Sequence, residues 1–413
     1  MRIFTAVRHS IDPGLYYGGL WSGNFYPALR EVGHEIVESQ VDLLPLSRFM
    51  QIGADFTSDE LATRARITER IVDEVKRAHD ERPLDLFLSY FYNAHFDPAG
   101  YEEIDRIGIP TVNFYCNSTY QFELVTEIAA KARFAWHTER DAGAAYVRAG
   151  ANPVWVQMGA DPAVYRPALG RHRKPAACFV GQRYADRDRL LASLVMRSVP
   201  VDIYGNGWSR NNENGSTNNG RSNQMSYLGR GSIAPASTQS YLAASWKNLR
   251  SHGMIGGTAR TARQLRYRTE TRKLDGVLAK AAKGIAGDIG ETFAAYEVVL
   301  NFSNVWADGR PGSQLIPHVR LRDFEGPMCR SCYLTGASSE IEDFYEVRKE
   351  IDTYASAEEL IDKTKFYLSH STEAERLREA GYRRALRDHT WTRRFEQLFN
   401  KIGLTTKRKA TQA

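Results

Sequence analysis

Short apolar runs alternate with longer amphipathic stretches through the first 165 residues of the chain. Apolar runs of about four to eight residues indicate buried strands, and apolar positions three or four residues apart indicate helices. We predict strands at 2–7, 35–38, 84–90, 111–115, 134–137 and 154–157. Helices are predicted between several of them, at 21–32, 58–80 and 141–149. This alternation is typical of a Rossmann-like α/β domain around a parallel sheet.

The run Met158–Pro167 interrupts both periodicities, because proline, glycine and charged residues are concentrated in it and just after it. We place a domain boundary here, with a first domain at 1–166 and a second at 174–389. The alternation then restarts, with strands predicted at 177–180 and 201–204 around a helix at 187–196. The second domain is therefore expected to repeat the architecture of the first.

The middle of the second domain departs from this alternation. Residues 205–223 are rich in Asn, Gly and Ser and almost free of apolar side chains, so a mobile loop is expected. We interpret about 209–290 as a loop and basic insertion. The fold then resumes at 292–302, and a disordered tail is expected at 405–413. Later elements are predicted at 322–329, 331–335, 357–369, 373–388 and 392–402.

Composition places the chain among ordinary globular proteins, since 42% of its 413 residues are hydrophobic and 25% are charged. No run approaches the roughly 18 consecutive apolar residues of a membrane span, and the start does not resemble a signal peptide. With only four cysteines, a cytoplasmic protein is expected. Cys329 and Cys332 have the C-x-x-C spacing of redox or zinc sites, but without further ligands nearby we predict no metal.

The net charge of +6 is concentrated locally. Residues 247–283 hold ten Lys and Arg against only Glu270 and Asp275. Such a stretch suits an anionic partner, yet it also fits a solvated pair of basic helices. Because aromatic residues are not regularly interleaved with the charge, Tyr267 being the one aromatic residue in the stretch, we favour the solvated helices over a nucleic-acid surface.

Residues that follow the predicted strands are the main candidates for binding, because α/β domains bind ligands at the carboxyl ends of their strands. Gly181 follows a strand and precedes a helix start that offers free N–H groups to a phosphate, and Arg183 and Arg187 add positive charge. Tyr204 and Gly205 follow the next strand and offer a stacking face and a close backbone approach. Each segment alone also fits a plain strand-to-helix or loop turn.

The densest group of candidates lies in Pro317–Met328, where basic residues precede an acidic one at a predicted helix start. A carboxylate can accept both hydroxyls of a ribose, and arginines can neutralise a pyrophosphate. Glu325 with Arg320 or Arg322 therefore suits a nucleoside diphosphate. The alternative is a surface cluster of salt bridges at a helix cap.

The first domain offers His9 and His95, each just after a predicted strand. Either imidazole can act as a general base on an acceptor hydroxyl, because it titrates near neutral pH. Each histidine is also compatible with a purely structural role.

Several segments together resemble the CgeB-like glycosyltransferases, a family named for a spore maturation protein. The resemblance is carried by four stretches of the second domain, 179–187, 203–208, 299–303 and 320–335, and by shorter matches at 350–354, 367–368, 380–384 and 389–395. The first domain matches only loosely. A glycine usual near Arg330 is missing, and the long basic segment is atypical of the family.

The resemblance implies a GT-B fold, with two Rossmann-like domains facing a cleft and a last helix, 390–404, crossing back to the first domain. It implies metal-independent transfer of a sugar from a nucleotide-diphosphate sugar, without a further cofactor, to an unidentified acceptor. Glu325 would bind the ribose, and Arg183 with Arg187 would meet the diphosphate. Asn301 and Phe324 lie in the matching stretches and complete the expected donor site.

The sequence leaves three hypotheses about function open. The first is a glycosyltransferase, the second a nucleotide-sugar epimerase or hydrolase of the same fold, and the third a non-catalytic binding module that uses the basic segment. Peripheral contact with a membrane surface is compatible with that segment, whereas nucleic acid is disfavoured. No residue of the sequence is diagnostic of the sugar, the base, the acceptor, the stereochemical outcome or the oligomeric state.

Overall fold

The computed structural model describes residues 1–9, 16–43, 56–168, 172–208 and 238–404, without the side chains of 16–18, 238–253 and 255. Most of the predicted loop and all of the predicted tail lie outside these residues. The chain forms two compact units, Met1–Asp161 with His389–Ala413, and Pro162–Asp388. The division after Asp161 falls within the run in which the sequence places the domain boundary, a few residues before the predicted position.

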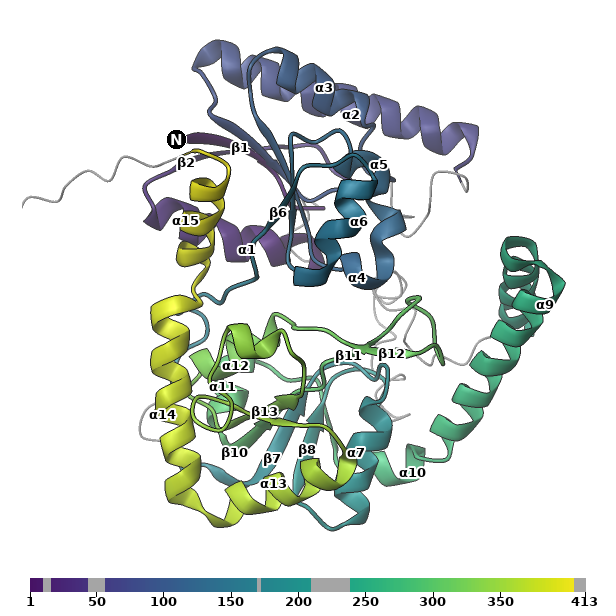
Figure 1. Cartoon of the computed structure of the whole chain (residues 1–413), viewed down its shortest axis with the longest axis vertical. Helices are drawn as coiled ribbons and strands as arrows, with labels where there is room; N and C mark the ends of the chain where they lie inside the picture. The colour runs from purple at the N-terminus through teal and green to yellow at the C-terminus, as the bar shows by residue number, and fades with distance from the viewer. Residues whose placement is uncertain (10–15, 44–55, 169–171, 209–237, 405–413) are drawn as a thin grey trace, which may run out of the picture. The chain divides into compact units, whose positions relative to one another are not determined.

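The first unit is built on a parallel sheet of six strands in the order β2-β1-β3-β4-β5-β6 (Figure 1). Each predicted strand of this region is present. The strands are β1 (Arg2–Ala6), β2 (Glu35–Glu38), β3 (Leu86–Ser89), β4 (Thr111–Tyr115), β5 (Phe134–His137) and β6 (Pro153–Trp155). The helices are α1 (Tyr16–Glu31), α2 (Ser58–Glu81), α3 (Ala99–Arg106), α4 (Ser118–Gln121), α5 (Thr126–Ala129), α6 (Gly143–Arg148) and α15 (Trp391–Lys401).

Local sequence explains why α2 starts and packs where it does. Thr57 and Glu60 form a capping box, in which each side chain accepts a hydrogen bond from the other residue's backbone N–H. Ile67, Ile71 and Val75 then recur four residues apart and are buried along one face. The helix runs almost as the periodicity predicts.

Helix α15 belongs to the first unit although it follows the whole second unit in sequence. Trp391 donates a hydrogen bond from Nε1 to Asn24 Oδ1 at 2.9 Å, and its ring lies edge-on to Trp21 and Phe25 in α1. Close backbone packing supports this docking, because a Cβ on Gly159 would lie 2.7 Å from the carbonyl carbon of Thr390. The expected return of the last helix to the first domain is confirmed.

The second unit also contains a six-stranded parallel sheet, in the order β14-β13-β10-β7-β8-β9 (Figure 1). β7 is the first strand of this sheet in sequence. β8 and β9 are added on one side of it, and β10, β13 and β14 on the other. The direction of strand addition therefore reverses between β7 and β10, as in a doubly wound Rossmann sheet. The strands are β7 (Lys174–Val180), β8 (Val201–Tyr204), β9 (Ala282–Gly284), β10 (Tyr296–Leu300), β13 (Tyr333–Gly336) and β14 (Asp352–Tyr354). The remaining elements are α7 (Arg187–Met196), α9 (Thr238–Arg272), α10 (Asp275–Leu278), α11 (Ile289–Ala294), the hairpin of β11 (Asn304–Trp306) and β12 (Leu315–Pro317), α12 (Arg322–Met328), α13 (Ala357–Ser369) and α14 (Ser371–Asp388).

The prediction of an insertion up to residue 290 is wrong at its C-terminal end. β9 pairs with β8 as the edge strand of the sheet, so α9 and α10 form part of an extended crossover between two neighbouring strands. Hydrophobic periodicity does not predict β9, because the strand is three residues long and has no apolar pattern.

The described part of α9 carries its positive charge alongside acidic partners. Arg260 and Arg263 lie 3.5 and 3.0 Å from Asp308, and Arg266 lies 2.9 Å from Glu270. This pairing agrees with the solvated-helix interpretation. No described helix is both long and apolar enough to cross a membrane.

We expect Gly159→Ala to lower the free energy of unfolding by about 1–3 kcal/mol, because the added methyl group would overlap rigid backbone atoms of residues 390–391. Urea denaturation followed by tryptophan fluorescence measures this change. Gly143→Ala, in α6, is the control. An added Cβ there meets only the His137 ring at 3.8 Å, so stability should be unchanged or slightly higher. Equal effects in the two variants would contradict the close packing at Gly159.

The first unit should also lose stability in mild acid. Burial is the main cause that lowers the pKa of His34 and of His137 to about 4. An unfolded chain, with an imidazole pKa near 6.5, therefore binds more protons than the native state between about pH 6.5 and 4. The free energy of unfolding should fall as the pH drops through this window.

His137→Gln should reduce this slope by up to about 1.4 kcal/mol per pH unit, because it removes one group that is protonated only on unfolding. Urea denaturation at several pH values gives the slope. His370→Gln is the control, since that side chain is exposed and loses little hydration on folding. A slope that His137→Gln leaves unchanged would contradict the assignment.

Candidate functional site

The reversal between β7 and β10 locates the candidate site of the second unit. In doubly wound sheets, a crevice forms outside the carboxyl ends of the two strands at which the order reverses. β7 ends at Val180 and β10 at Leu300, so the segments after them, beginning at Gly181 and Asn301, border this position. Both segments contain residues that the sequence singles out.

Gly181 and Gly205 pack backbone against backbone at the ends of β7 and β8. A Cβ on Gly205, whose φ is 127°, would lie 2.2 Å from the carbonyl oxygen of Gly181. Trp208 donates from Nε1 to that same oxygen at 2.7 Å and is buried in the core. The glycines are thus required by the packing of two loops, and the ring of Trp208 belongs to the core.

Tyr204 is also engaged within the sheet. Its hydroxyl lies 2.7 Å from that of Tyr296, which in turn donates to the carboxylate of Asp202 at 2.5 Å. The predicted role of Tyr204 as a stacking partner for a base gains no support from this arrangement.

Arg183 faces the interior of the unit. Its guanidinium donates to Asp275 Oδ1 at 2.7 Å and to the carbonyl oxygen of Thr271 at 2.5 Å, and Nε lies 3.5 Å from Asp188. The side chain is 5% exposed. Because these donors already hold α7, α9 and α10 together, the geometry does not support the predicted contact of Arg183 with a diphosphate.

Arg187 has a different environment. Its guanidinium carbon lies 5.4 Å from the ring centre of Phe179 and 5.7 Å from that of Tyr184, and one of its N–H groups donates to the carbonyl oxygen of Gln182 at 2.8 Å. Burial and then the positive charge of Arg320 lower the pKa of Arg187 to about 9. Burial of Arg187 next to a like charge favours an anion at this position.

Arg320 approaches the same tyrosine. Its guanidinium carbon lies 5.8 Å from the centre of the Tyr184 ring, and Nη2 donates to the carbonyl oxygen of Asn304 at 3.1 Å. Neither Arg187 nor Arg320 makes an ion pair with a carboxylate in the part of the chain that the structure describes. The Nε atoms of both are buried and lack a hydrogen-bond partner there. The structure thus brings together two of the predicted arginines around Tyr184, a residue that the sequence does not single out.

The segment that leads into α12 is fixed by a buried carboxylate that the sequence analysis does not assign. Asp323 Oδ1 accepts hydrogen bonds from Asn301, Tyr333 and Thr335 at 3.0, 3.1 and 2.8 Å. Its Oδ2 accepts one from the backbone N–H of Arg320 at 2.7 Å. Burial raises the pKa of Asp323, against the effect of these bonds. Asn301 therefore supports α12 from the end of β10 and is turned toward this carboxylate.

Glu325 lies two residues further along α12 and makes a different contact. It is 1% exposed, and Oε2 forms an ion pair with Arg322, while Oε1 is buried without a hydrogen-bond partner in the described residues. Arg322 therefore neutralises Glu325, which differs from its predicted role beside a pyrophosphate. Phe324 packs edge-on against Phe344 at 5.4 Å and is fully buried, so its place among the binding residues is a misassignment: it belongs to the core.

The two candidate histidines of the first unit are neighbours. In the order β2-β1-β3, the reversal falls between β1 and β3, and His9 and His95 follow these two strands. Their ring centres are 4.4 Å apart. Burial lowers the pKa of His9 to about 4 and that of His95 well below its usual value. Both imidazoles are therefore neutral near pH 7.

Hydrogen bonds distinguish the two rings. His9 Nε2 lies 2.7 Å from the carbonyl oxygen of Tyr90, which only accepts, so Nε2 carries the proton and Nδ1 is the basic atom. His95 Nδ1 instead accepts from the backbone N–H of Tyr92 at 3.2 Å. His9 is therefore the better placed of the two to accept a further proton.

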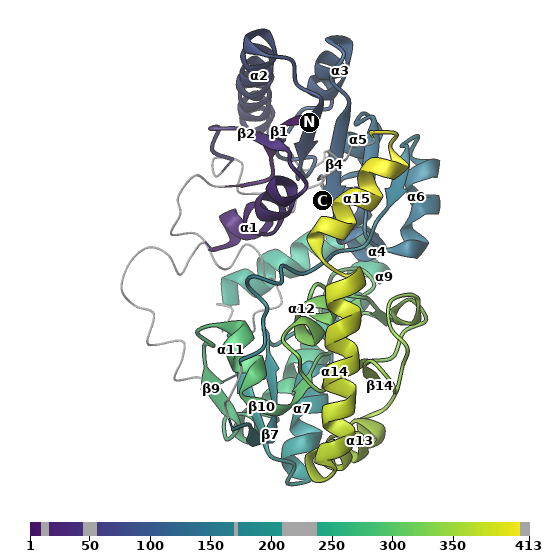
Figure 2. The same ribbon diagram turned by 90° about the vertical axis from the view of Figure 1, so that its left-hand side faces the viewer.

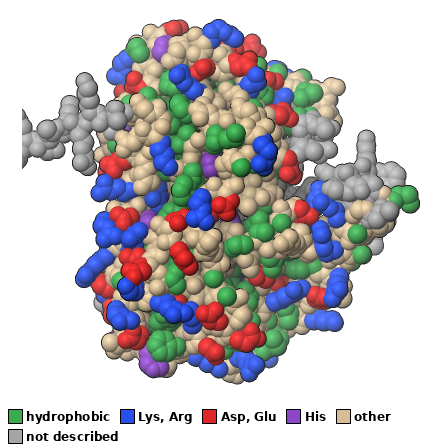
Figure 3. All heavy atoms as spheres, in the orientation of Figure 1, with side chains coloured by type: hydrophobic (Ala, Val, Ile, Leu, Met, Phe, Trp, Pro, Cys, Tyr) green, Lys and Arg blue, Asp and Glu red, His purple; other side chains and the backbone are tan. Residues whose placement is uncertain are grey.

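The remaining candidate features, the cysteine pair and the surface charge, form no further site among the described residues. The four cysteines are buried free thiols, and burial raises the pKa of Cys329 and Cys332. On the face shown in Figure 3, basic and acidic side chains are interspersed. These observations do not favour a redox role for the cysteine pair or a role for this face in nucleic-acid binding.

Comparison with known proteins gives one family match. A protein family described as glycosyl transferase-like matches residues 242–400, which include β10, α12 and α14. No curated protein matches the chain.

Solved structures match nearly the whole chain. Sucrose-phosphate synthase from Thermosynechococcus elongatus is 11% identical, with 98% of this chain and 99% of that chain covered and a TM-score of 0.56. Anabaena HepE in complex with UDP is 11% identical, with 98% and 100% covered and a TM-score of 0.54. AviGT4, a glycosyltransferase involved in avilamycin A biosynthesis, is 13% identical, with 97% and 96% covered and a TM-score of 0.53. The chain thus has the GT-B glycosyltransferase fold, and the family match supports a transferase.

Proposed function

We propose that the protein transfers a sugar from a nucleotide-diphosphate sugar to an acceptor, with its donor site at the carboxyl edge of the sheet in the second unit. The observation that carries the proposal is the pair Arg187 and Arg320, two guanidinium groups that share the Tyr184 ring. Among the described residues, no carboxylate forms an ion pair with either of them, although Asp186 lies near enough to raise the pKa of Arg187 slightly against the larger effects of burial and of Arg320. A diphosphate supplies the negative charge that such a pair favours.

Glu325 extends this site from phosphate to ribose. Its buried Oε1 has no hydrogen-bond partner among the described residues, and a carboxylate oxygen can accept hydrogen bonds from sugar hydroxyls. An unsatisfied buried carboxylate oxygen is costly, so a ligand that donates to it gains affinity. Binding of UDP to the structurally similar HepE agrees in kind with a nucleoside diphosphate here.

The proposed reaction forms a bond between the acceptor oxygen and the anomeric carbon of the sugar, and breaks the bond from that carbon to the diphosphate oxygen. The departing diphosphate accumulates negative charge, which the two fixed arginines stabilise. We propose that these guanidinium groups make the transfer metal-independent. The acceptor proton goes to a base, for which His9 Nδ1 in the first unit is the proposed atom.

We also propose that the chain belongs to the CgeB-like subfamily of glycosyltransferases. It rests on the stretches 179–187 and 320–335, which here contain the arginine pair and Glu325. The acceptor is left open. A panel of nucleoside diphosphates in a thermal-shift assay identifies the base, since a ligand that binds only the folded state raises the melting temperature.

Glu325→Ala should weaken binding of the best nucleoside diphosphate at least tenfold, or by about 1.4 kcal/mol, because the ribose hydroxyls lose their acceptor. Isothermal titration calorimetry measures the affinity, and circular dichroism checks the fold. Glu342→Ala removes an exposed carboxylate from the same unit and serves as the control. If Glu325→Ala binds nucleotide as tightly as the parent protein does, the assignment of this site is wrong.

Arg320→Met should weaken binding of the nucleoside diphosphate about tenfold or more while leaving the affinity for the corresponding nucleoside nearly unchanged, because only the diphosphate meets the guanidinium. The same titrations with both ligands separate these effects. A loss that is equal for diphosphate and nucleoside would place Arg320 away from the phosphates. Arg183→Met should instead lower stability, since Arg183 has internal partners.

A further inference from the structure

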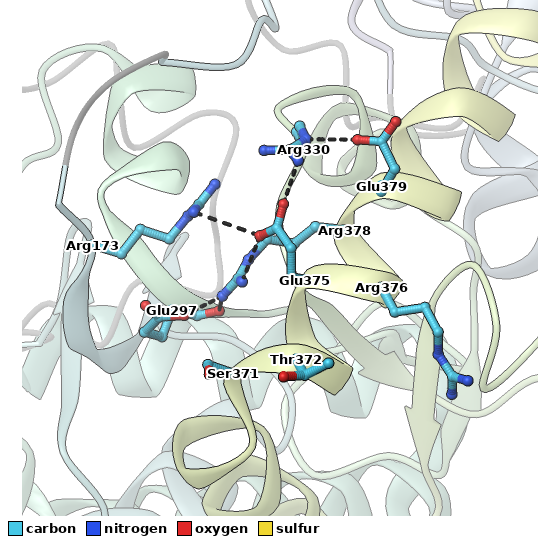
Figure 4. A pocket seen from close by; sticks show the side chains of 9 residues that line it. All are labelled: Arg173, Glu297, Arg330, Ser371, Thr372, Glu375, Arg376, Arg378 and Glu379. Atoms are coloured by element: carbon cyan, nitrogen blue, oxygen red, sulfur yellow. Dashed lines mark hydrogen bonds and ion pairs between the residues drawn. The ribbon is translucent and has the colours of Figure 1, made fainter.

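A network of arginine and glutamate side chains lies at the amino-terminal edge of the second unit's sheet, opposite the candidate donor site. It surrounds a pocket of about 650 Å³ between the starts of β7, β10 and β13 and the helix α14 (Figure 4). The pocket is lined by Arg173, Glu297, Arg330, Ser371, Thr372, Glu375, Arg376, Arg378 and Glu379. The arginines and glutamates of this pocket form ion pairs with one another. We call this network the clamp, because it joins α14 to neighbouring elements.

Arg330 is the unusual member of this network. It lies in the turn between α12 and β13, with φ at 55°, in the left-handed region that favours glycine. A non-glycine residue persists in such a conformation when its surroundings compensate for the strain. The contacts of the Arg330 side chain provide such compensation.

Those contacts join the turn after α12 to α14. Arg330 Nε donates to Glu379 Oε2 at 2.9 Å, and Nη2 donates to Glu375 (Figure 4). Glu375 also accepts from Arg378 at 3.1 Å, and Arg378 donates to the carboxylate and the carbonyl oxygen of Glu297 at the start of β10. A continuous chain of ion pairs thus links the turn after α12, α14 and the sheet.

α14 is itself held closely where it passes α12 (Figure 2). A Cβ on Gly381 would lie 2.2 Å from the carbonyl oxygen of Glu350 and 3.7 Å from Cβ of Pro327 in α12. The absence of a side chain at residue 381 therefore allows α14 to pack directly on the backbone at Glu350, with α12 at van der Waals distance. α14 provides a rigid support on which the ion pairs of Arg330 act.

We propose that Arg330 is a positioning residue of the donor site, which holds the C-terminal end of α12 against α14 and thereby sets the orientation of Glu325. This inference rests on the proposed function in one respect, namely that Glu325 binds a nucleoside diphosphate. α12 has seven residues, so its direction is determined at its two ends. The Asp323 hydrogen bonds fix the first end, and the Arg330 ion pairs fix the second.

Arg330→Gly separates positioning from stability, because glycine relieves the left-handed backbone strain while it removes the ion pairs. We expect the urea midpoint to stay nearly unchanged, since the lost ion pairs are partly exposed. Amide exchange in residues 322–329 should become about tenfold faster, and affinity for the best nucleoside diphosphate should fall roughly fivefold. Arg330→Lys, which retains one positive charge, should recover part of both losses.

Arg383→Gln is the matched control. It removes an ion pair to the same Glu379 carboxylate, at 2.7 Å, from a side chain on α14 that does not reach the turn after α12. Both the exchange of 322–329 and the nucleotide affinity should remain as in the parent protein.

Amide exchange and nucleotide affinity test different parts of the proposal. Unchanged exchange at 322–329 in Arg330→Gly would overturn the positioning role whatever the ligand. Faster exchange with unchanged affinity, in a parent protein that binds nucleoside diphosphate, would overturn the link to Glu325. If the parent protein binds no nucleotide although Arg330→Gly loosens α12, the proposed function fails while the clamp itself is supported.

Discussion

The buried carboxylate of Asp323 is the interaction on which the candidate site of the second unit depends. It collects hydrogen bonds from the end of β10, from β13 and from the backbone N–H of Arg320. Burial of a carboxylate is costly unless hydrogen bonds compensate for the lost hydration, so this carboxylate draws the groups that donate to it to one point. Arg320 directly precedes α12 at this point, and Glu325 follows on the helix. The Asp323 carboxylate therefore positions both the arginine proposed to bind the diphosphate and the glutamate proposed to bind the ribose.

The arginines of this unit show how the same side chain takes opposite roles. Arg183 and Arg187 are four residues apart in sequence, yet Arg183 is paired with Asp275 inside the unit and Arg187 lies near another cation. A guanidinium with internal partners stabilises the fold, whereas one that is buried next to a like charge is stabilised by an anion. Arg330 represents a third role, since its strained backbone is compensated by ion pairs to a neighbouring helix.

Both units place their candidate residues by the same topological rule. In each sheet, the strand order reverses next to the first strand of the unit, and the residues after the two strands at the reversal come together. His9 and His95 meet in this way across about ninety residues of sequence, as do the segments after β7 and β10. The order of strands, more than the residues themselves, brings distant candidates into one place.

The sequence by itself determined the elements that have strong periodicity and clear caps, such as α2 with Thr57, the strands of the first unit and the terminal helices. It also singled out 320–325 as a candidate binding segment, because charged residues at a helix start are a local feature. Only the tertiary structure decided which arginines are free to meet a ligand, that Phe324 belongs to the core, that Asp323 organises the site, and that residues 282–284 complete the sheet. The reason is physical: propensity and capping act over a few residues, whereas pairing of buried charges and addition of an edge strand depend on partners that are distant in sequence.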